Sequence, residues 1–229
     1  MQTEAMGRVL DILDRIYPYH PMADITQRDP FKVLISCLLT LRSRDVVTLP
    51  VCRKLCVIAE TPQQLLDIPK ESLIELIKPV QFYNNKAEIL RGVCRELLTR
   101  FDGQVPERLE DLESLKGVGR KTANLVLQLG FDQPAICVDT HVHRICNRLG
   151  YIKTKDAEAT EAVLSQKLPV HYWNVINRVM VRHGQEICVA NHPKCDLCPV
   201  FELCERVDVI PRKSRSALKA VHEVFLPQS

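Results

Sequence analysis

Two glycines one residue apart, Gly117 and Gly119, most constrain how this 229-residue chain can fold. Leucines recur at helical spacing over residues 109–115, directly before the glycines, and a nearly continuous apolar run over residues 123–129 follows them. Glycine readily adopts the positive φ that a tight reversal of the backbone requires. The stretch therefore predicts a helix, a glycine hairpin and a second helix that is buried inside a domain.

The glycine hairpin is also a candidate anion site. The backbone N–H groups of Gly117, Val118 and Gly119 can approach an oxyanion closely, and the following helix begins with unpaired donors at the positive end of its dipole. Arg120 comes next and would add charge to the same oxyanion. A plain turn between two helices is the alternative, because such turns are common.

Lys121 is a candidate nucleophile. It lies in the first turn of the second helix, beside Arg120 and at the positive end of the helix dipole. Both effects favour the neutral amine, which can attack a carbon atom and form a Schiff base. A solvated lysine that helps to hold phosphate is the alternative, and the spacing alone does not separate the two.

Asp139 is a candidate partner for Lys121. It follows a strand-like apolar run over residues 135–138 and precedes a predicted helix that begins at Thr140. Its carboxylate could simply cap that helix. It could also stabilise a developing sugar cation or take a proton from the lysine. The sequence alone does not place this carboxylate near Lys121.

The ten cysteines fall into two groups. The N-terminal segment is acidic and leads into an amphipathic helix, so we expect neither a signal peptide nor a membrane span, and the cysteines are not expected to form disulfides. Six are scattered among apolar residues and are expected in the core: Cys37, Cys52, Cys56, Cys94, Cys137 and Cys146. The other four predict a metal site, for which zinc and a [4Fe–4S] cluster are candidates and the compact loop favours the cluster: Cys188, Cys195, Cys198 and Cys204.

Composition and patterning predict an all-α fold. Hydrophobic residues make up 46% of the chain, enough for one large or two small domains, and no strand alternation or repeat is evident. A net charge of +3 permits a nucleic-acid partner without demanding one. Besides the helices around the hairpin and after Asp139, helices are expected over residues 9–16, 30–41, 69–77, 87–101, 160–168 and 172–183, with another opening at Pro62.

Three motifs in this order resemble the endonuclease III family of helix-hairpin-helix DNA glycosylases. They are Gly-Val-Gly-Arg-Lys-Thr-Ala-Asn over residues 117–124, Val-Asp-Thr-His over residues 138–141, and a Cys-x6-Cys-x2-Cys-x5-Cys loop. The resemblance spans residues 31–206 and implies an all-α fold of two lobes. One lobe would be a six-helix barrel over residues 25–133 that carries the hairpin. The other would combine residues 1–24 and 134–229, with a [4Fe–4S] cluster in the loop 188–204 and a basic tail at residues 212–215.

The resemblance also implies a function. The chain would be a bifunctional DNA glycosylase and AP lyase of base excision repair, acting as a monomer in the prokaryotic cytoplasm, in association with the nucleoid. Its partner would be duplex DNA that contains oxidised pyrimidines or abasic sites. Lys121 would attack C1′ of a flipped-out nucleotide, Asp139 would stabilise the cationic sugar, and β-elimination would cut the strand 3′ to the lesion.

DNA contacts are expected from the hairpin and from several residues elsewhere: Gly117, Val118, Gly119, Arg120, Arg42, Arg44, Phe82, His141 and Lys194. Three positions depart from the family pattern. Arg42 stands where a glutamine typically fills the gap left by the flipped base, Phe82 stands where a leucine wedge is typical, and Lys116 replaces a usual proline. From the residues alone, Arg42 and Arg44 could be a solvated helix end, and Phe82 could be a core anchor.

Two other functions are compatible with these motifs. An adenine or mismatch-thymine glycosylase would remove a base without efficient strand cleavage, but such relatives usually lack a lysine at the position of Lys121. A non-catalytic DNA-binding or redox-sensing module could use the same hairpin and cluster. Such a module would need neither Lys121 nor Asp139.

Overall fold

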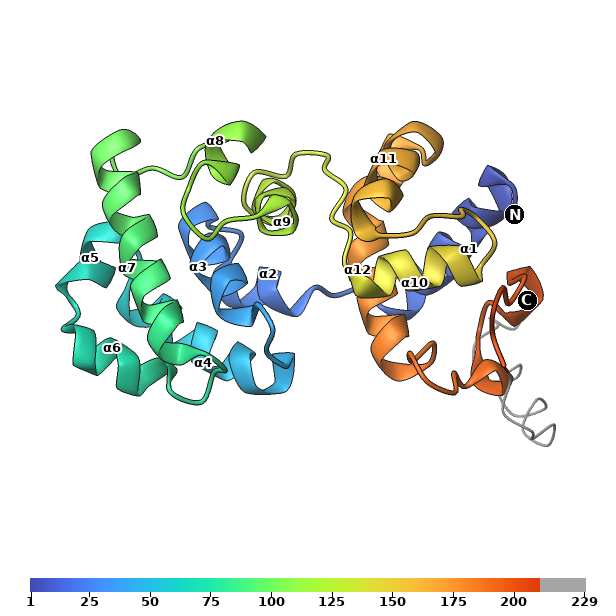
Figure 1. The fold of residues 1–229 in the computed structure, drawn as a ribbon, viewed down its shortest axis with the longest axis horizontal. Helices are drawn as coiled ribbons and strands as arrows, with labels where there is room; N and C mark the ends of the chain where they lie inside the picture. The colour runs from blue at the N-terminus through green and yellow to red at the C-terminus, as the bar shows by residue number, and fades with distance from the viewer. Residues whose placement is uncertain (211–229) are drawn as a thin grey trace. The chain divides into compact units, whose positions relative to one another are not determined.

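The computed structural model describes residues 1–210, and every regular element in that range is a helix (Figure 1). The all-α prediction is therefore confirmed. The chain divides into two compact units, which we call the hairpin unit, Tyr19–Ala135, and the cysteine unit, Met1–Pro18 with the chain from Ile136 onward. The basic run predicted at residues 212–215 lies outside the described residues. Among residues 1–210, no helix combines the length and the apolarity that a membrane span requires.

The hairpin unit is a cluster of eight helices among its described residues: α2 (Pro21–Thr26), α3 (Pro30–Thr40), α4 (Asp45–Ile58), α5 (Pro62–Asp67), α6 (Lys70–Ile77), α7 (Tyr83–Arg100), α8 (Leu109–Glu113) and α9 (Arg120–Gly130). The central helix is α3, whose residues 33–39 are all buried and which packs against α4, α7 and α9. Figure 1 shows α9 end-on beside α3. A Cβ atom at Gly130 would lie 2.9 Å from Pro30 Cα, so glycine permits the close approach of these two helices.

Local signals explain where several of these helices begin. The carboxylate of Asp29 accepts a hydrogen bond from the Lys32 backbone N–H (2.8 Å) at the start of α3, and the Thr61 hydroxyl accepts one from the Gln64 N–H (3.2 Å) at the start of α5. Both helices then continue with proline at the first helical position, as predicted. The sequence signals did not reveal α2 and α4, and α4 contains Pro50 in its interior.

The unit boundary at the N-terminal side falls after Pro18, ahead of the residue 25 that the resemblance implied. The reason is α2, which packs on α3 and α4 within the hairpin unit.

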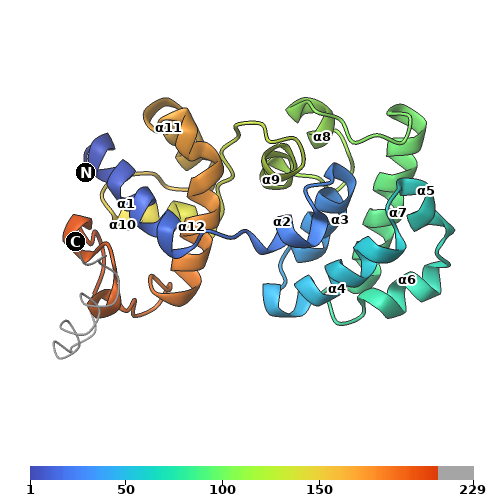
Figure 2. The same cartoon turned by 180° about the vertical axis from the view of Figure 1, so that it is seen from behind.

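The cysteine unit is built around α12 (Trp173–Glu186), which packs against α1 (Thr3–Ile16) and α10 (Thr140–Arg148), with α1 visible from behind in Figure 2. It also contains α11 (Ala157–Lys167) and three short 3₁₀ turns, η1 (Val170–Tyr172), η2 (Cys195–Leu197) and η3 (Phe201–Leu203). The guanidinium of Arg178 on α12 pairs with Asp14 and donates to the Tyr17 carbonyl, which ties the N-terminal helix to the rest of the unit.

The strand-like run over residues 135–138 is buried but forms no strand. Within the cysteine unit, the Asn177 side-chain amide donates to the Cys137 carbonyl (3.1 Å) and so satisfies a backbone acceptor that a strand partner would otherwise satisfy. The apolar character of this run therefore reflects burial rather than strand pairing.

Candidate functional site

The glycine hairpin joins α8 to α9 as predicted, but its two glycines differ. Gly117 has φ +92°, and a Cβ atom there would lie 2.8 Å from Ile89 Cγ2 on α7. Gly119 has an ordinary φ of −102° as the N-cap of α9, and a Cβ atom there would meet nothing within 4 Å. The prediction of positive φ thus holds for Gly117, where the fold requires glycine, whereas the backbone of Gly119 is simply left uncovered.

The hairpin turns its charged residues outward. Val118 is buried and its N–H donates to the Leu115 carbonyl (3.0 Å), which fixes the turn on the core. Arg120 is exposed and pairs with Glu113 of α8 at 3.3 Å. Lys121 is also exposed, in the first turn of α9, while the next residue, Thr122, is buried. The exposed backbone of Gly119 and the side chains of Arg120 and Lys121 are therefore presented together at one helix start.

Asp139 caps α10. Its Oδ1 atom accepts hydrogen bonds from the backbone N–H groups of His141 and Val142, both at 2.9 Å. The capping alternative derived from the sequence is therefore correct, and it also gives the carboxylate a fixed orientation. Asp139 lies in the cysteine unit, whereas Lys121 lies in the hairpin unit.

His141 is half-buried and packs between two helices of the cysteine unit. Its Nδ1 atom lies 3.1 Å from Arg144 Nη2, and a Cβ atom at Gly184 of α12 would clash with that ring nitrogen. Glycine at position 184 therefore makes room for His141 between α10 and α12. This packing role was not evident from the sequence.

Arg42 and Phe82 are exposed residues with unusual backbone conformations. Arg42, between α3 and α4, has φ +54°, and Phe82, the N-cap of α7, has φ +58°. The Phe82 side chain is 62% exposed, so the core-anchor alternative is wrong. Positive φ in residues other than glycine is strained and commonly marks functional positions. Arg44 is exposed at the N-cap of α4.

Lys86 is a functional candidate that the sequence reasoning missed. It is only 5% exposed, and its Nζ atom donates to the Leu39 carbonyl (2.6 Å), the Leu41 carbonyl (2.6 Å) and the Ser43 hydroxyl (3.1 Å). Burial lowers the pKa of its ammonium group to about 8, so the group remains mostly charged at neutral pH. Its helical spacing with Leu90 and Val93, both core residues, is the signal that could have placed it on the buried face of α7.

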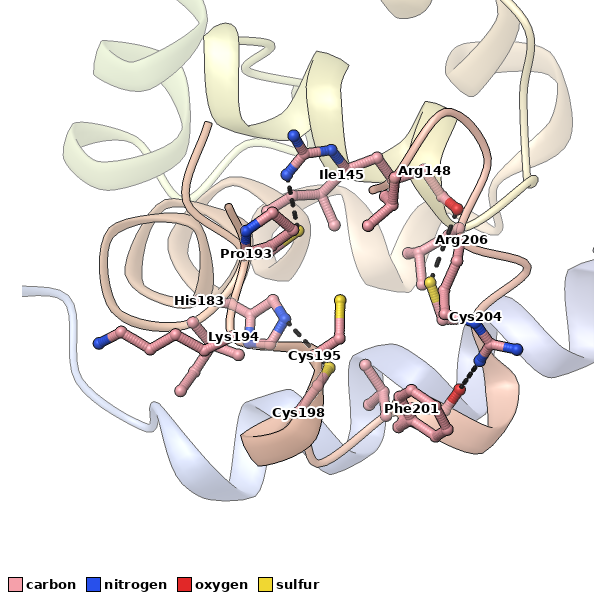
Figure 3. Close-up of a pocket in the computed structure, with 15 residues that line it drawn as sticks. Ile145, Arg148, His183, Pro193, Lys194, Cys195, Cys198, Phe201, Cys204 and Arg206 are labelled. Atoms are coloured by element: carbon pink, nitrogen blue, oxygen red, sulfur yellow. Dashed lines mark hydrogen bonds between the residues drawn. The ribbon is translucent and has the colours of Figure 1, made fainter. Parts of the chain in front are cut away.

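The four clustered cysteines line one cavity of ≈ 30 Å³ (Figure 3). Each contributes a sulfur from a different point of the loop after α12: Cys188, Cys195, Cys198 and Cys204. The six other cysteines are buried in the two cores, as predicted. The amine of Lys194 extends away from the sulfur atoms in Figure 3.

Polar groups of α10 and α12 surround the sulfur atoms. Arg148 Nη1 donates to Cys188 Sγ (3.4 Å), and His183 Nε2 lies 3.7 Å from Cys198 Sγ. Burial raises the pKa of the Cys198 thiol to about 12 and also raises the pKa of the Cys204 thiol. A bound cation would reverse this preference, because it favours the thiolate. Sulfur is the donor that thiophilic metals prefer, and four cysteines line this cavity. Among the described residues, no group of three or more His, Cys, Asp or Glu side chains is arranged to hold a single metal ion.

Residues 35–170 match the HhH-GPD superfamily, described as base excision DNA repair proteins. That range includes the glycine hairpin, Lys121 and Asp139. The chain belongs to this family. Relatives that are endonuclease III proteins confirm the resemblance that the three motifs suggested.

Individual members of the family are similar over most of their length. Endonuclease III of Thermotoga maritima is 46% identical over 179 residues, which cover 78% of this chain and 84% of that protein. Endonuclease III of Escherichia coli is 38% identical over 205 residues, which cover 87% and 97%. The solved structure of a trapped covalent intermediate of endonuclease III with DNA, an estranged-adenine complex, matches with a TM-score of 0.80 and 31% identity, over 90% of this chain and 97% of that one.

The two hairpin glycines are expected to differ in what they contribute to stability. Gly117→Ala should lower the free energy of unfolding by roughly 2–4 kcal/mol, because it adds both a strained φ and a clash with Ile89. Gly119→Ala should change it by less than about 1 kcal/mol. Urea unfolding followed by circular dichroism measures both. If the free energy of unfolding fell by the same amount in the two variants, this account of the hairpin would be contradicted.

Proposed function

We propose that the chain is a bifunctional DNA glycosylase and AP lyase that removes oxidised pyrimidines from duplex DNA. The observation that carries this proposal is the exposed Lys121 in the first turn of α9, directly after the uncovered backbone of Gly119. Membership of a base excision repair family supports it, as does the covalent complex trapped between a related endonuclease III and DNA.

In the proposed reaction Lys121 is the nucleophile. The damaged nucleotide leaves the base stack, because its sugar carbon is inaccessible inside a duplex. Lys121 Nζ forms a bond to C1′ while the bond from C1′ to the base breaks and the base departs with the electron pair. The sugar ring then opens as the bond from C1′ to O4′ breaks and O4′ takes a proton, which leaves an imine between C1′ and the lysine nitrogen. This imine acidifies the proton on C2′. Loss of that proton breaks the bond from C3′ to its oxygen and cuts the strand 3′ to the lesion.

Asp139 supplies negative charge to the same reaction. Its carboxylate stabilises the cationic sugar that develops as the base leaves and accepts a proton from the attacking lysine amine. The two hydrogen bonds that Oδ1 accepts at the start of α10 support this role, because they hold the carboxylate in one orientation. A preorientated charge needs little reorganisation during the reaction.

The hairpin holds the DNA backbone. The amide groups of Gly117 and Gly119 bind a phosphate, whereas the Val118 N–H is already used by the Leu115 carbonyl inside the turn. The positive end of the α9 dipole adds to the attraction. This contact fixes the register of the protein on the duplex without reading sequence. The open space next to Gly119 supports the assignment, since packing does not explain glycine there. The protein acts in this way as a monomer on the chromosome in a prokaryotic cytoplasm.

The four clustered cysteines hold a [4Fe–4S] cluster. Thiolates bound to the four iron atoms would cross-link the loop after α12 and so give it a fixed shape. The four sulfur atoms around one cavity support this role. The polar groups of Arg148 and His183 beside two of those sulfurs also support it, because they could stabilise thiolate charge.

Borohydride reduction tests the nucleophile. Wild-type protein should form a trapped covalent adduct with duplex DNA that contains thymine glycol, and Lys121→Gln should form none. Lys116→Gln is the matched control, because Lys116 is another exposed lysine of the same hairpin and should be dispensable. Denaturing gel electrophoresis measures the adduct. An adduct that persists in Lys121→Gln, or no adduct with wild type, would exclude Lys121 as the nucleophile.

A second substitution separates charge from capping at Asp139. Asp139→Asn keeps a side-chain oxygen for the cap, so the variant should remain folded while base removal slows by about 10²–10³-fold. Asp156→Asn is the control, since Asp156 caps α11 of the same unit in the same way (2.8 Å to the Ala159 N–H). Single-turnover rates and melting temperatures measure the two effects. Full activity in Asp139→Asn would reduce the residue to a helix cap.

Metal analysis tests the cluster. The purified protein should be brown and contain about four iron and about four sulfide ions per chain, and Cys198→Ser should lose most of them. Cys137→Ala, at a buried cysteine of the same unit, should retain the full content. Elemental analysis with visible absorption provides the measurement, and a colourless protein that holds zinc would contradict the assignment.

A further inference from the structure

Lys86 links two segments that are distant in the sequence. Its ammonium group binds the carbonyls of Leu39 and Leu41 and the hydroxyl of Ser43. These three acceptors lie at the end of α3 and in the turn that follows it, on both sides of Arg42. A positive charge is favourable at a helix C-terminus, where the last carbonyls lack partners within the helix.

The backbone of Lys86 is tied to the second segment. Its N–H donates to the Phe82 carbonyl (3.0 Å) in the first turn of α7. That bond is the first helical hydrogen bond of α7, so Lys86 lies one turn after Phe82, and its side chain ties this helix start to the turn around Arg42. Three donors with three acceptors leave this ammonium group little freedom to move.

The two segments share a backbone conformation that seven other non-glycine residues within residues 1–210 also adopt. Arg42 (φ +54°) and Phe82 (φ +58°) are both exposed, and both have a positive φ, which is strained for a residue other than glycine. Such conformations persist only where surrounding contacts hold them. The side chain of Lys86 can hold them, because it binds residues 39, 41 and 43 on both sides of Arg42 and extends from the helix turn that begins at Phe82.

We propose that Lys86 is a positioning residue that holds Arg42 and Phe82 as a pair of probes for insertion into the duplex at the lesion. Phe82 is the apolar wedge that separates stacked bases, and Arg42 contacts the base left opposite the lesion. The guanidinium of Arg42 can both stack on a base and donate hydrogen bonds to its edge. This inference rests on the proposed glycosylase function, and it assigns to Lys86 a part in choosing the opposite base.

Lys86→Met tests the inference, because it keeps an apolar stem and removes the three donors. Base removal should be measured under single-turnover conditions on thymine-glycol duplexes with each of the four opposite bases, and strand cleavage on a duplex with a preformed abasic site. We expect base removal to slow by roughly tenfold or more. We also expect a smaller ratio between the fastest and slowest rates among the four opposite bases, which we call the spread of rates. Cleavage at the abasic site, which needs less unstacking, should change by less than about threefold.

Arg91→Met is the matched control. The guanidinium of Arg91, on the same helix, donates to the carbonyls of Leu66 (3.2 Å) and Ile68 (2.8 Å), in a segment that carries neither probe. This variant loses a comparable anchor, so any general effect of loosening α7 should appear in it. We expect its spread of rates among the opposite bases to equal that of the wild type. If the differences in base-removal rate among the four opposite bases became as small in Arg91→Met as in Lys86→Met, the inference would be overturned.

Combining Lys86→Met with substitutions of both probes provides the most direct test. If Lys86 acts through the probes, Lys86→Met should cause no further loss of base removal in a variant that already carries Arg42→Ala and Phe82→Ala. Losses that multiply would show that Lys86 acts elsewhere and would overturn the inference. If Lys86→Met does not fold, Ser43→Ala removes one acceptor only and should narrow the spread in the same direction. An unchanged spread in that variant would also overturn it.

The wild-type enzyme separates the two ways of failing. A wild type that acts on neither substrate would refute the proposed function, and this inference with it. A wild type that acts on both, together with a Lys86→Met variant that slows both reactions equally and keeps the spread among opposite bases, would refute the inference alone.

Discussion

The packing of α9 is the constraint on which the candidate site depends. At its end, Gly130 lies so close to Pro30 that a Cβ atom would come within 2.9 Å of the proline Cα. Before its start, Gly117 lies against Ile89 of α7, where a Cβ atom would come within 2.8 Å. The helix and its hairpin are therefore fixed at both ends by contacts that only glycine permits. Lys121 takes its position from this arrangement.

Cationic side chains that donate to backbone carbonyls fix loops in both units. In the hairpin unit Lys86 holds the turn around Arg42. In the cysteine unit, Arg144 donates to the Cys188 carbonyl (3.0 Å), and Arg148 donates to the carbonyls of Val189 (2.8 Å) and Ala190 (2.6 Å). Both arginines belong to α10, the helix that Asp139 caps. A single helix thus carries the proposed catalytic carboxylate at one end and anchors the cysteine loop along its length.

Features set by local chemistry could be predicted from the sequence. The caps at Thr61 and Asp139 follow from side chains that bond to backbone N–H groups a few residues away, and the turn at Gly117 follows from the φ that it needs. The spacing of the four clustered cysteines also indicated that they would lie together, and they line one cavity. These features require no knowledge of distant contacts.

Features set by tertiary contacts were missed. The helix α4 was not predicted, because it contains Pro50 in its interior and an interior proline normally argues against a helix. The apolar sequence of residues 135–138 was interpreted as a strand, but these residues are buried without strand pairing. A buried extended segment and a buried strand have the same apolar pattern, so the sequence does not distinguish them. The role of Lys86 depends on carbonyls more than forty residues away, and the exposure of Phe82 depends on a strained backbone that no short pattern reveals.

Peptide mapping of the reduced protein–DNA adduct tests the central claim most directly. After proteolysis and digestion of the DNA, tandem mass spectrometry should place the sugar remnant on the side chain of Lys121. A remnant on any other amine, such as the N-terminus or Lys116, would contradict the account.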